Sequence, residues 1–255
     1  MHVIRLFAMK RAGSHAVLDW ITTLFPGNVC FLNDVINDRT VCSSKECCDL
    51  PSLPLARRTR AGDEKDLLLF NLEDPSLANT GTWWLDTGAQ SGTAKRVSIL
   101  LLRDPFNLFA SRLKAARDEV GSVFSNNLLP PFNHPEKILH QMWIEHAREF
   151  LNETSLIDGQ KVIINYNQWC FDEGYRQTLS REIGGNETTG LTQLIPRQGF
   201  GSSFEGWRGR VLKNRVGLLN RWRHFQEDST YLNLIENEEM QKLSLQIFGP
   251  IRDEQ

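Results

Sequence analysis

The segment HVIRLFAMKRAGSHAVLDWI, residues 2–21, joins an apolar run to a helical pattern through a short basic loop. Residues 2–8 are apolar enough to predict a strand, and apolar side chains recur at helical spacing after Gly13. A helix begins with backbone N–H groups that have no partner, and its dipole adds about half a positive charge there. Because Lys10 and Arg11 stand beside this helix start, the segment predicts an anion-binding loop between a strand and a helix.

The rest of the chain repeats the alternation of strand and helix. Further apolar runs, which predict strands buried on both faces of a parallel sheet, span residues 28–32, 66–74, 96–104 and 161–166. Helical patterns begin at Asp104-Pro105, a carboxylate cap followed by proline, and span residues 134–153, 168–183, 212–227 and 236–247. This order predicts one three-layer α/β/α domain over residues 1–255, with a central, mainly parallel sheet and ligands at the carboxyl ends of its strands.

Composition narrows the class of protein. The chain has 255 residues, of which 40% are hydrophobic and 24% charged, as expected for one soluble globular domain. A net charge of −2 argues against a dedicated nucleic-acid-binding protein, and no apolar run is long enough to span a membrane. The five cysteines leave at least one unpaired, which favours the cytoplasm. Three of them cluster at Cys42, Cys47 and Cys48, without the paired spacing of a zinc site.

The basic loop lacks the pattern of a nucleotide-hydrolysing P-loop. That pattern, G-x-x-x-x-G-K-[ST], places a lysine after the last glycine, whereas Lys10 and Arg11 precede Gly13. A good second acidic element for magnesium is also missing. The loop therefore predicts a phosphate-like ligand that is bound without nucleotide hydrolysis.

A second motif, LLLRDPFNLFASR at residues 100–112, stands at the end of another buried strand. It places Arg103 at the strand end and Ser111 about two turns into the next helix. Two explanations are open. Either both side chains bind a further anion, or Arg103 pairs with a carboxylate while Ser111 faces solvent.

Together the two motifs resemble the sulfotransferase family, which uses 3′-phosphoadenosine-5′-phosphosulfate as its sulfuryl donor. The K/R-x-G-[ST]-[ST] loop of that family, which holds the 5′-phosphosulfate, is matched in its arginine form by Arg11, Ala12, Gly13, Ser14 and His15. Its R-D-P-x(5)-S element, which holds the 3′-phosphate, is matched by Arg103, Asp104, Pro105 and Ser111. VIINYNQW, residues 162–169, resembles a later strand of the family, with Tyr166 at its tyrosine.

The resemblance implies a P-loop-like fold and a sulfuryl transfer. A hydroxyl or amine of a small-molecule or glycan acceptor attacks the sulfur in line, and 3′,5′-adenosine bisphosphate leaves. Arg11 and the N–H groups around Gly13 and Ser14 would stabilise the charge that develops on the leaving phosphate. The implied reaction requires no metal. The resemblance leaves the acceptor and the oligomeric state open.

The residue that accepts the proton is open among several candidates. Carbohydrate-type members of the family use a glutamate after the next short strand, and Asp34 stands close to that place. His15 is the second candidate, and its alternative role is a hydrogen bond to phosphate at the helix start. Asp19 and Glu73 are weaker candidates, expected as a solvent-facing helix residue and a hydrogen-bonding residue at a strand end.

A basic region follows late in the chain. Residues 197–223 contain seven Lys or Arg against one acidic residue. In the family a late basic loop with glycine closes over the 3′-phosphate, and the expected ligands here are Ser202, Ser203 and Arg208. Two roles are open for Arg215, Arg221 and Arg223: they bind the anion, or they form the solvated face of a helix.

Acceptor pockets are expected in the variable loops at about residues 35–65, 75–95 and 118–135. Arg57, Arg58 and Arg60 in the first of these loops would suit an acidic acceptor or form a solvated basic loop. Two other functions compete with sulfuryl transfer. One is a nucleotide kinase or NTPase of related fold, and the other is a nucleotide-binding module without catalysis.

Overall fold

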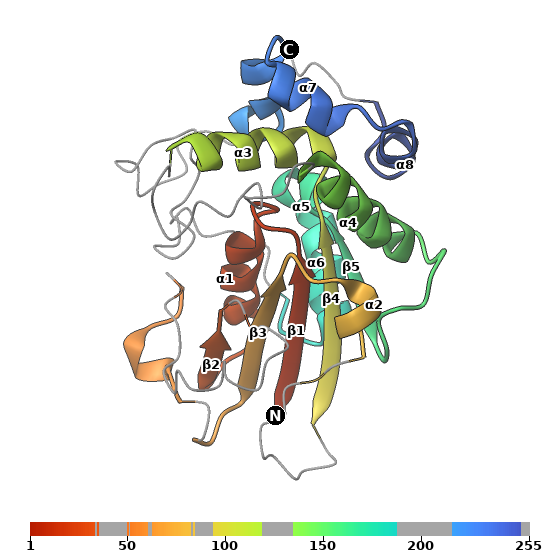
Figure 1. Cartoon of the computed structure of the whole chain (residues 1–255). Coiled ribbons are helices and arrows are strands. Elements are labelled where there is room, and N and C mark those ends of the chain that lie inside the picture. The colour runs from red at the N-terminus through yellow and green to blue at the C-terminus, as the bar shows by residue number, and fades with distance from the viewer. Residues whose placement is uncertain are drawn as a thin grey trace.

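The computed structural model describes residues 1–33, 35, 50, 52–60, 63–82, 84, 94–118, 135–187 and 216–250. Within these ranges five parallel strands form one sheet in the order β2-β3-β1-β4-β5 (Figure 1). The strands are β1 (His2–Ala8), β2 (Val29–Leu32), β3 (Leu67–Glu73), β4 (Lys95–Leu102) and β5 (Lys161–Asn165). Each coincides with an apolar run of the sequence to within a residue or two, so the predicted parallel sheet is confirmed.

The order of the strands marks one place at the carboxyl edge of the sheet. After β1 the chain goes to β2 at one edge of the sheet and returns to β3 beside β1, and it then crosses to β4 and β5 on the other side. The connections that follow β1 and β4 therefore lead in opposite directions from neighbouring strands. Ligands of open α/β sheets bind at such a reversal, outside the carboxyl ends of the strands. The two predicted anion-binding motifs, at residues 9–15 and 103–111, begin at these two strand ends.

Helices cover both faces of the sheet, because alternate strand residues are apolar on either side. One face packs against α1 (Ser14–Leu24), α5 (Tyr166–Phe171) and α6 (Glu173–Ile183), in a core that includes Ile4 and Leu6 of β1. The other face, with Val3 and Phe7 of β1, packs against α2 (Leu77–Thr80) and the chain before β5. This arrangement agrees with the expected α/β/α layers.

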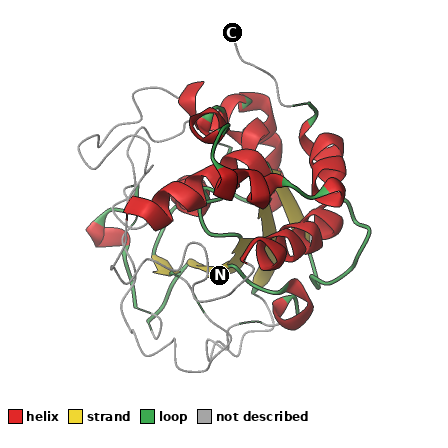
Figure 2. Cartoon of the chain, turned by 45° about the horizontal axis from the view of Figure 1, so that its top comes forward, coloured by secondary structure: helices red, strands yellow, loops and turns green. Residues whose placement is uncertain are grey.

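More helices gather beyond the carboxyl edge of the sheet. They are α3 (Pro105–Asp118), α7 (Ser229–Ile235) and α8 (Glu238–Phe248), whereas α4 (Pro135–Phe150) packs against β4 and reaches Lys161 at the start of β5. Figure 1 shows α3 lying across the top of the strands with α7 and α8 beyond it, and Figure 2 brings this end forward. Two short 3₁₀ helices, η4 (Val216–Leu219) and η5 (Arg221–Phe225), lead into this group, and η5 packs on α3. Another, η2 (Leu55–Arg57), precedes β3.

Two helix predictions need correction. The helix expected over 212–227 is wrong for its described part, which forms two separate 3₁₀ helices, η4 and η5. The reason is that tertiary hydrogen bonds use their backbone groups. The Leu218 carbonyl accepts from Arg103, and the Arg221 N–H donates to Asn107. The helix expected over 168–183 is two helices, because Asp172 is extended and its side chain caps α6. α2 and α7 were not expected.

A fully buried arginine in the central strand also departs from the apolar pattern. Arg5 donates to Ser98 Oγ at 2.9 Å and to the Gly81 carbonyl at 2.7 Å, and it pairs with Asp158. Its guanidinium lies 3.8 Å from the centre of the Trp84 ring. Arg5 therefore ties the chain after α2 and the chain before β5 to the middle of the sheet. None of the helices in the described ranges is both long and apolar enough to cross a membrane.

Candidate anion-binding site

The basic loop between β1 and α1 has a conformation that few residues tolerate. Arg11 and Gly13 both have positive φ, at 69° and 96°, and the Ala12 N–H donates to the Met9 carbonyl at 3.0 Å. A Cβ on Gly13 would lie 2.5 Å from Cζ of Tyr166 and closer still to Cε2. Glycine is required here by both its φ and its contact with the Tyr166 ring. The loop thus leads from β1 into the N-terminus of α1, as the sequence predicts.

A buried ion pair supports the loop from the side of β3. Asp74 accepts from Arg112 at 2.7 Å and 3.0 Å, and from the Lys10 N–H at 2.8 Å. Burial alone would raise the pKa of the Asp74 carboxyl, but the Arg112 charge and these hydrogen bonds hold it below its usual value. Asp74 is therefore ionised near neutral pH and fixes the backbone at Lys10.

Arg103 lies directly beside this loop, as the second motif predicts. Its side chain is 1% exposed, and Nη1 donates to the Arg11 carbonyl at 3.1 Å and lies 3.5 Å from Ser111 Oγ. Nη2 donates to the Leu218 carbonyl at 2.7 Å. The guanidinium lies 5.2 Å from the centre of the Tyr166 ring. Arg103 thus contacts both predicted anion-binding motifs.

The alternative roles for this motif were an ion pair between Arg103 and a carboxylate, and a solvent-facing Ser111. Neither is found in the described part of the chain. No carboxylate pairs with Arg103 in the described part of the chain, and its buried Nε has no hydrogen-bond partner there. Ser111 is fully buried, not solvent-facing. Arg103 and Ser111 are therefore both buried and lie within 3.5 Å of each other.

Arg221 joins the same cluster. Its Nη1 donates to Ser111 Oγ at 2.9 Å, and its backbone N–H donates to Asn107 Oδ1 at 2.8 Å. The residue is 6% exposed, so a solvated helix face is wrong for Arg221, whereas Arg223 is exposed. No local pattern in the sequence separates the two arginines. The pairing of Arg221 with Ser111 joins positions 110 residues apart.

A second polar cluster lies at the other side of the α1 start, beside the end of β3. Ser14 Oγ donates to Glu73 Oε1 at 3.2 Å, and His15 Nδ1 lies 3.9 Å from the same oxygen. Burial, with a smaller contribution from the Arg11 charge, lowers the pKa of His15 to about 4, so its ring is neutral near pH 7. The prediction that Glu73 forms hydrogen bonds at a strand end is confirmed.

Several predicted residues have other surroundings, or none that are described. Asp34, Ser202, Ser203, Arg208 and Arg215 lie outside the described residues, as do Cys42, Cys47 and Cys48. Asp19 is buried and accepts two hydrogen bonds from Ser52, so its expected exposure is wrong. Arg57 donates to carbonyls at the end of α1, and Arg58 to the Leu53 carbonyl, so these two arginines hold backbone groups.

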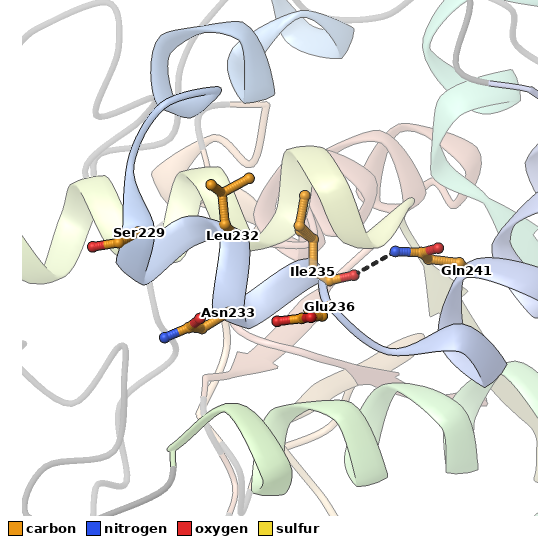
Figure 3. A pocket seen from close by; sticks show the side chains of 6 residues that line it. All are labelled: Ser229, Leu232, Asn233, Ile235, Glu236 and Gln241. Atoms are coloured by element: carbon orange, nitrogen blue, oxygen red, sulfur yellow. Dashed lines mark hydrogen bonds between the residues drawn. The ribbon is translucent and has the colours of Figure 1, made fainter.

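A surface hollow elsewhere shares no residue with this cluster. It lies on α7 and the start of α8 and is lined by Ser229, Leu232, Asn233, Ile235, Glu236 and Gln241 (Figure 3). Gln241 Nε2 donates to the Ile235 carbonyl at 2.9 Å within it. In the described ranges, no group of three His, Cys, Asp or Glu side chains is arranged to hold a metal ion.

Comparison with known proteins returned no match: no family model, no curated protein and no solved structure matches the chain. The residues that define the site are Arg11, Arg103, Ser111 and Arg221. They form an arginine-rich, largely buried cluster at the carboxyl ends of β1 and β4, suited to a ligand with more than one anionic group.

Proposed function

We propose that the chain is a sulfotransferase that moves a sulfuryl group from 3′-phosphoadenosine-5′-phosphosulfate to a hydroxyl or amine of a small-molecule or glycan acceptor. The observation that carries the proposal is the convergence of Arg103 and Arg221 on Ser111, directly beside the loop of Arg11 and Gly13. One donor molecule with a phosphate at each end would engage both groups. The cysteine usage further supports a cytoplasmic protein.

The burial of the arginines supports an anionic ligand. A guanidinium removed from water is costly unless charge and hydrogen bonds compensate it. Arg103 is 1% exposed, pairs with no carboxylate in the described ranges and has a buried Nε without a partner. A phosphate group would supply both the charge and the acceptor oxygens. A P-loop-like fold is proposed on the same grounds, since the loop after the central strand leads into a helix N-terminus.

Each end of the site has a separate task in the proposed reaction. Arg103, Ser111 and Arg221 bind the 3′-phosphate and orient the donor. Arg11, with the N–H groups at Gly13 and Ser14, stabilises the charge that grows on the 5′-phosphate as its bond to sulfur breaks. Tyr166 supports the loop, because its ring packs against Gly13. The sequence predicts Asp34 and His15 as proton acceptors. It also predicts Ser202, Ser203 and Arg208 as further ligands of the donor.

The test is transfer of radiolabelled sulfate from the donor to a panel of sugars, lipids, phenols and peptides, with and without EDTA. The proposal expects a labelled product and no effect of EDTA. An Arg103→Lys variant should bind the donor more weakly, because lysine lacks the forked donors that reach Ser111 and two carbonyls at once. Bisphosphate binding without any use of the donor would indicate a nucleotide-binding module without catalysis.

One observation favours a second candidate, a nucleotide kinase or NTPase. Ser14 at the α1 start donates to Glu73 at the end of β3, and Mg²⁺ in phosphate-transfer sites is held by a hydroxyl, one or two carboxylates and phosphate oxygens. The missing lysine after Gly13 counts against it. Thermal stabilisation by ATP that depends on Mg²⁺, and exceeds stabilisation by 3′,5′-adenosine bisphosphate, would select this candidate.

A further inference from the structure

The carboxylate of Glu73 contacts the residues that open α1. Its Oε1 accepts from Ser14 Oγ at 3.2 Å and from Asn71 Nδ2 at 3.4 Å, and it lies 3.9 Å from His15 Nδ1. Glu73 is the register partner of Ala8, the last residue of β1. Glu73 therefore stands at the strand end from which the anion loop begins. The Glu73 carboxylate therefore accepts a hydrogen bond from the Ser14 hydroxyl, within the proposed donor site.

Other carboxylates near this edge are used to hold the protein together. Asp74 forms a bidentate pair with the buried Arg112. Asp104 caps α3 through the N–H and side chain of Asn107. Glu73, in contrast, contacts the first two residues of α1, Ser14 and His15, beside the anion loop.

We propose that Glu73 is the catalytic base of the sulfuryl transfer, which makes this inference dependent on the proposed function. The oxygen or nitrogen of the acceptor forms a bond to sulfur, and the bond between sulfur and the 5′-phosphate oxygen breaks. The electron pair of that bond leaves with the phosphate of 3′,5′-adenosine bisphosphate. The acceptor's proton passes to a carboxylate oxygen of Glu73. Atoms and charge balance without a metal or a further reagent.

Ser14 positions this carboxylate, and His15 lies 3.9 Å from it. The His15 ring, neutral near pH 7, does not neutralise Glu73 by forming a charged pair. Ser14 donates to Oε1, which orients the carboxylate relative to the anion loop.

The test compares Glu73→Gln, Glu73→Asp and Asp34→Asn with wild type, and uses Glu153→Gln, an exposed glutamate, as the matched control. Calorimetry gives the Kd for 3′,5′-adenosine bisphosphate, and circular dichroism confirms folding. Turnover is the release of labelled sulfate from the donor to water and to the acceptor panel. Glutamine keeps the oxygen that accepts from Ser14 but cannot take a proton, so Glu73→Gln separates positioning from catalysis.

The proposal expects Glu73→Gln to lose about 100-fold or more of the turnover while its bisphosphate Kd stays within about twofold, with partial activity in Glu73→Asp. It is overturned by turnover within about threefold of wild type in Glu73→Gln, by an equal loss of bisphosphate binding, or by a loss confined to Asp34→Asn. A wild-type protein that binds the bisphosphate but never uses the donor also overturns it. A wild-type protein that does not bind the bisphosphate refutes the proposed function itself.

Discussion

Substitution of Gly13 by alanine tests the architecture of the anion loop. The left-handed backbone at Gly13, with φ of 96°, costs a non-glycine residue about 1–2 kcal/mol. The added Cβ would also lie 2.5 Å from Cζ and 2.9 Å from Cδ2 of Tyr166, whose buried ring stacks on Trp169. Overpacking of this kind typically costs a further ~1–3 kcal/mol. Gly13→Ala should therefore lower the free energy of unfolding by about 2–5 kcal/mol.

Gly159 provides a matched control. Its φ is 75°, but a Cβ there would meet nothing within 4 Å. Gly159→Ala should therefore show the backbone cost alone, and the effect of alanine on the unfolded chain is shared by both variants. The assay is thermal unfolding, in which 1 kcal/mol corresponds to about 2–4 °C for a domain of this size. Equal losses in the two variants would refute the close packing of the loop against Tyr166.

Three further outcomes are expected at other residues. Arg11→Ala should lower sulfuryl-transfer turnover by about 100-fold, as for loss of one donor to a developing oxyanion, and unchanged turnover would remove Arg11 from the mechanism. The pKa of His15 is lowered to about 4, so unfolding takes up a proton between pH 4 and about 6.5. The free energy of unfolding therefore falls as the pH drops through that range, by up to about 1.4 kcal/mol per pH unit. Urea titrations at pH 7 and pH 5 should give a smaller drop in His15→Gln than in wild type, and identical drops would contradict the buried neutral ring. Arg57→Ala should cost about 1–2 kcal/mol in chemical denaturation, because carbonyls at the end of α1 lose a charged donor, whereas the exposed Arg60→Ala should have no measurable effect.

The sheet and the first two site elements were predictable because their signals are local. A continuous apolar run predicts a buried parallel strand wherever it stands in the chain. Arg11 and Arg103 each follow such a run, so their meeting at one edge follows from the parallel sheet itself. The convergence of Arg103 with Ser111 was likewise predictable, since both belong to one strand-to-helix connection.

Contacts between distant segments were not predictable. Arg221 and Arg223 carry the same charge two positions apart, and only the docking of η5 on α3 buries one of them. Asp19 stands on α1 where the pattern indicates exposure, yet the chain after residue 50 covers it through Ser52. Arg5 interrupts an apolar strand, and the groups that satisfy it come from other parts of the chain. In each case hydrogen bonds between distant segments determine whether the side chain is buried. The hydrophobic periodicity of the sequence gives no information on such contacts.

The most direct measurement is the difference in affinity between 3′,5′-adenosine bisphosphate and 5′-AMP, by calorimetry, in wild type and in the Arg221→Ala and Arg223→Ala variants. The two ligands differ by the 3′-phosphate alone. Wild type and Arg223→Ala should bind the bisphosphate about tenfold or more tightly than 5′-AMP, since charged hydrogen bonds contribute about 1.5–3 kcal/mol each. Arg221→Ala should lose most of that preference. Equal affinity for both ligands in wild type would contradict a phosphate site at Arg103, Ser111 and Arg221.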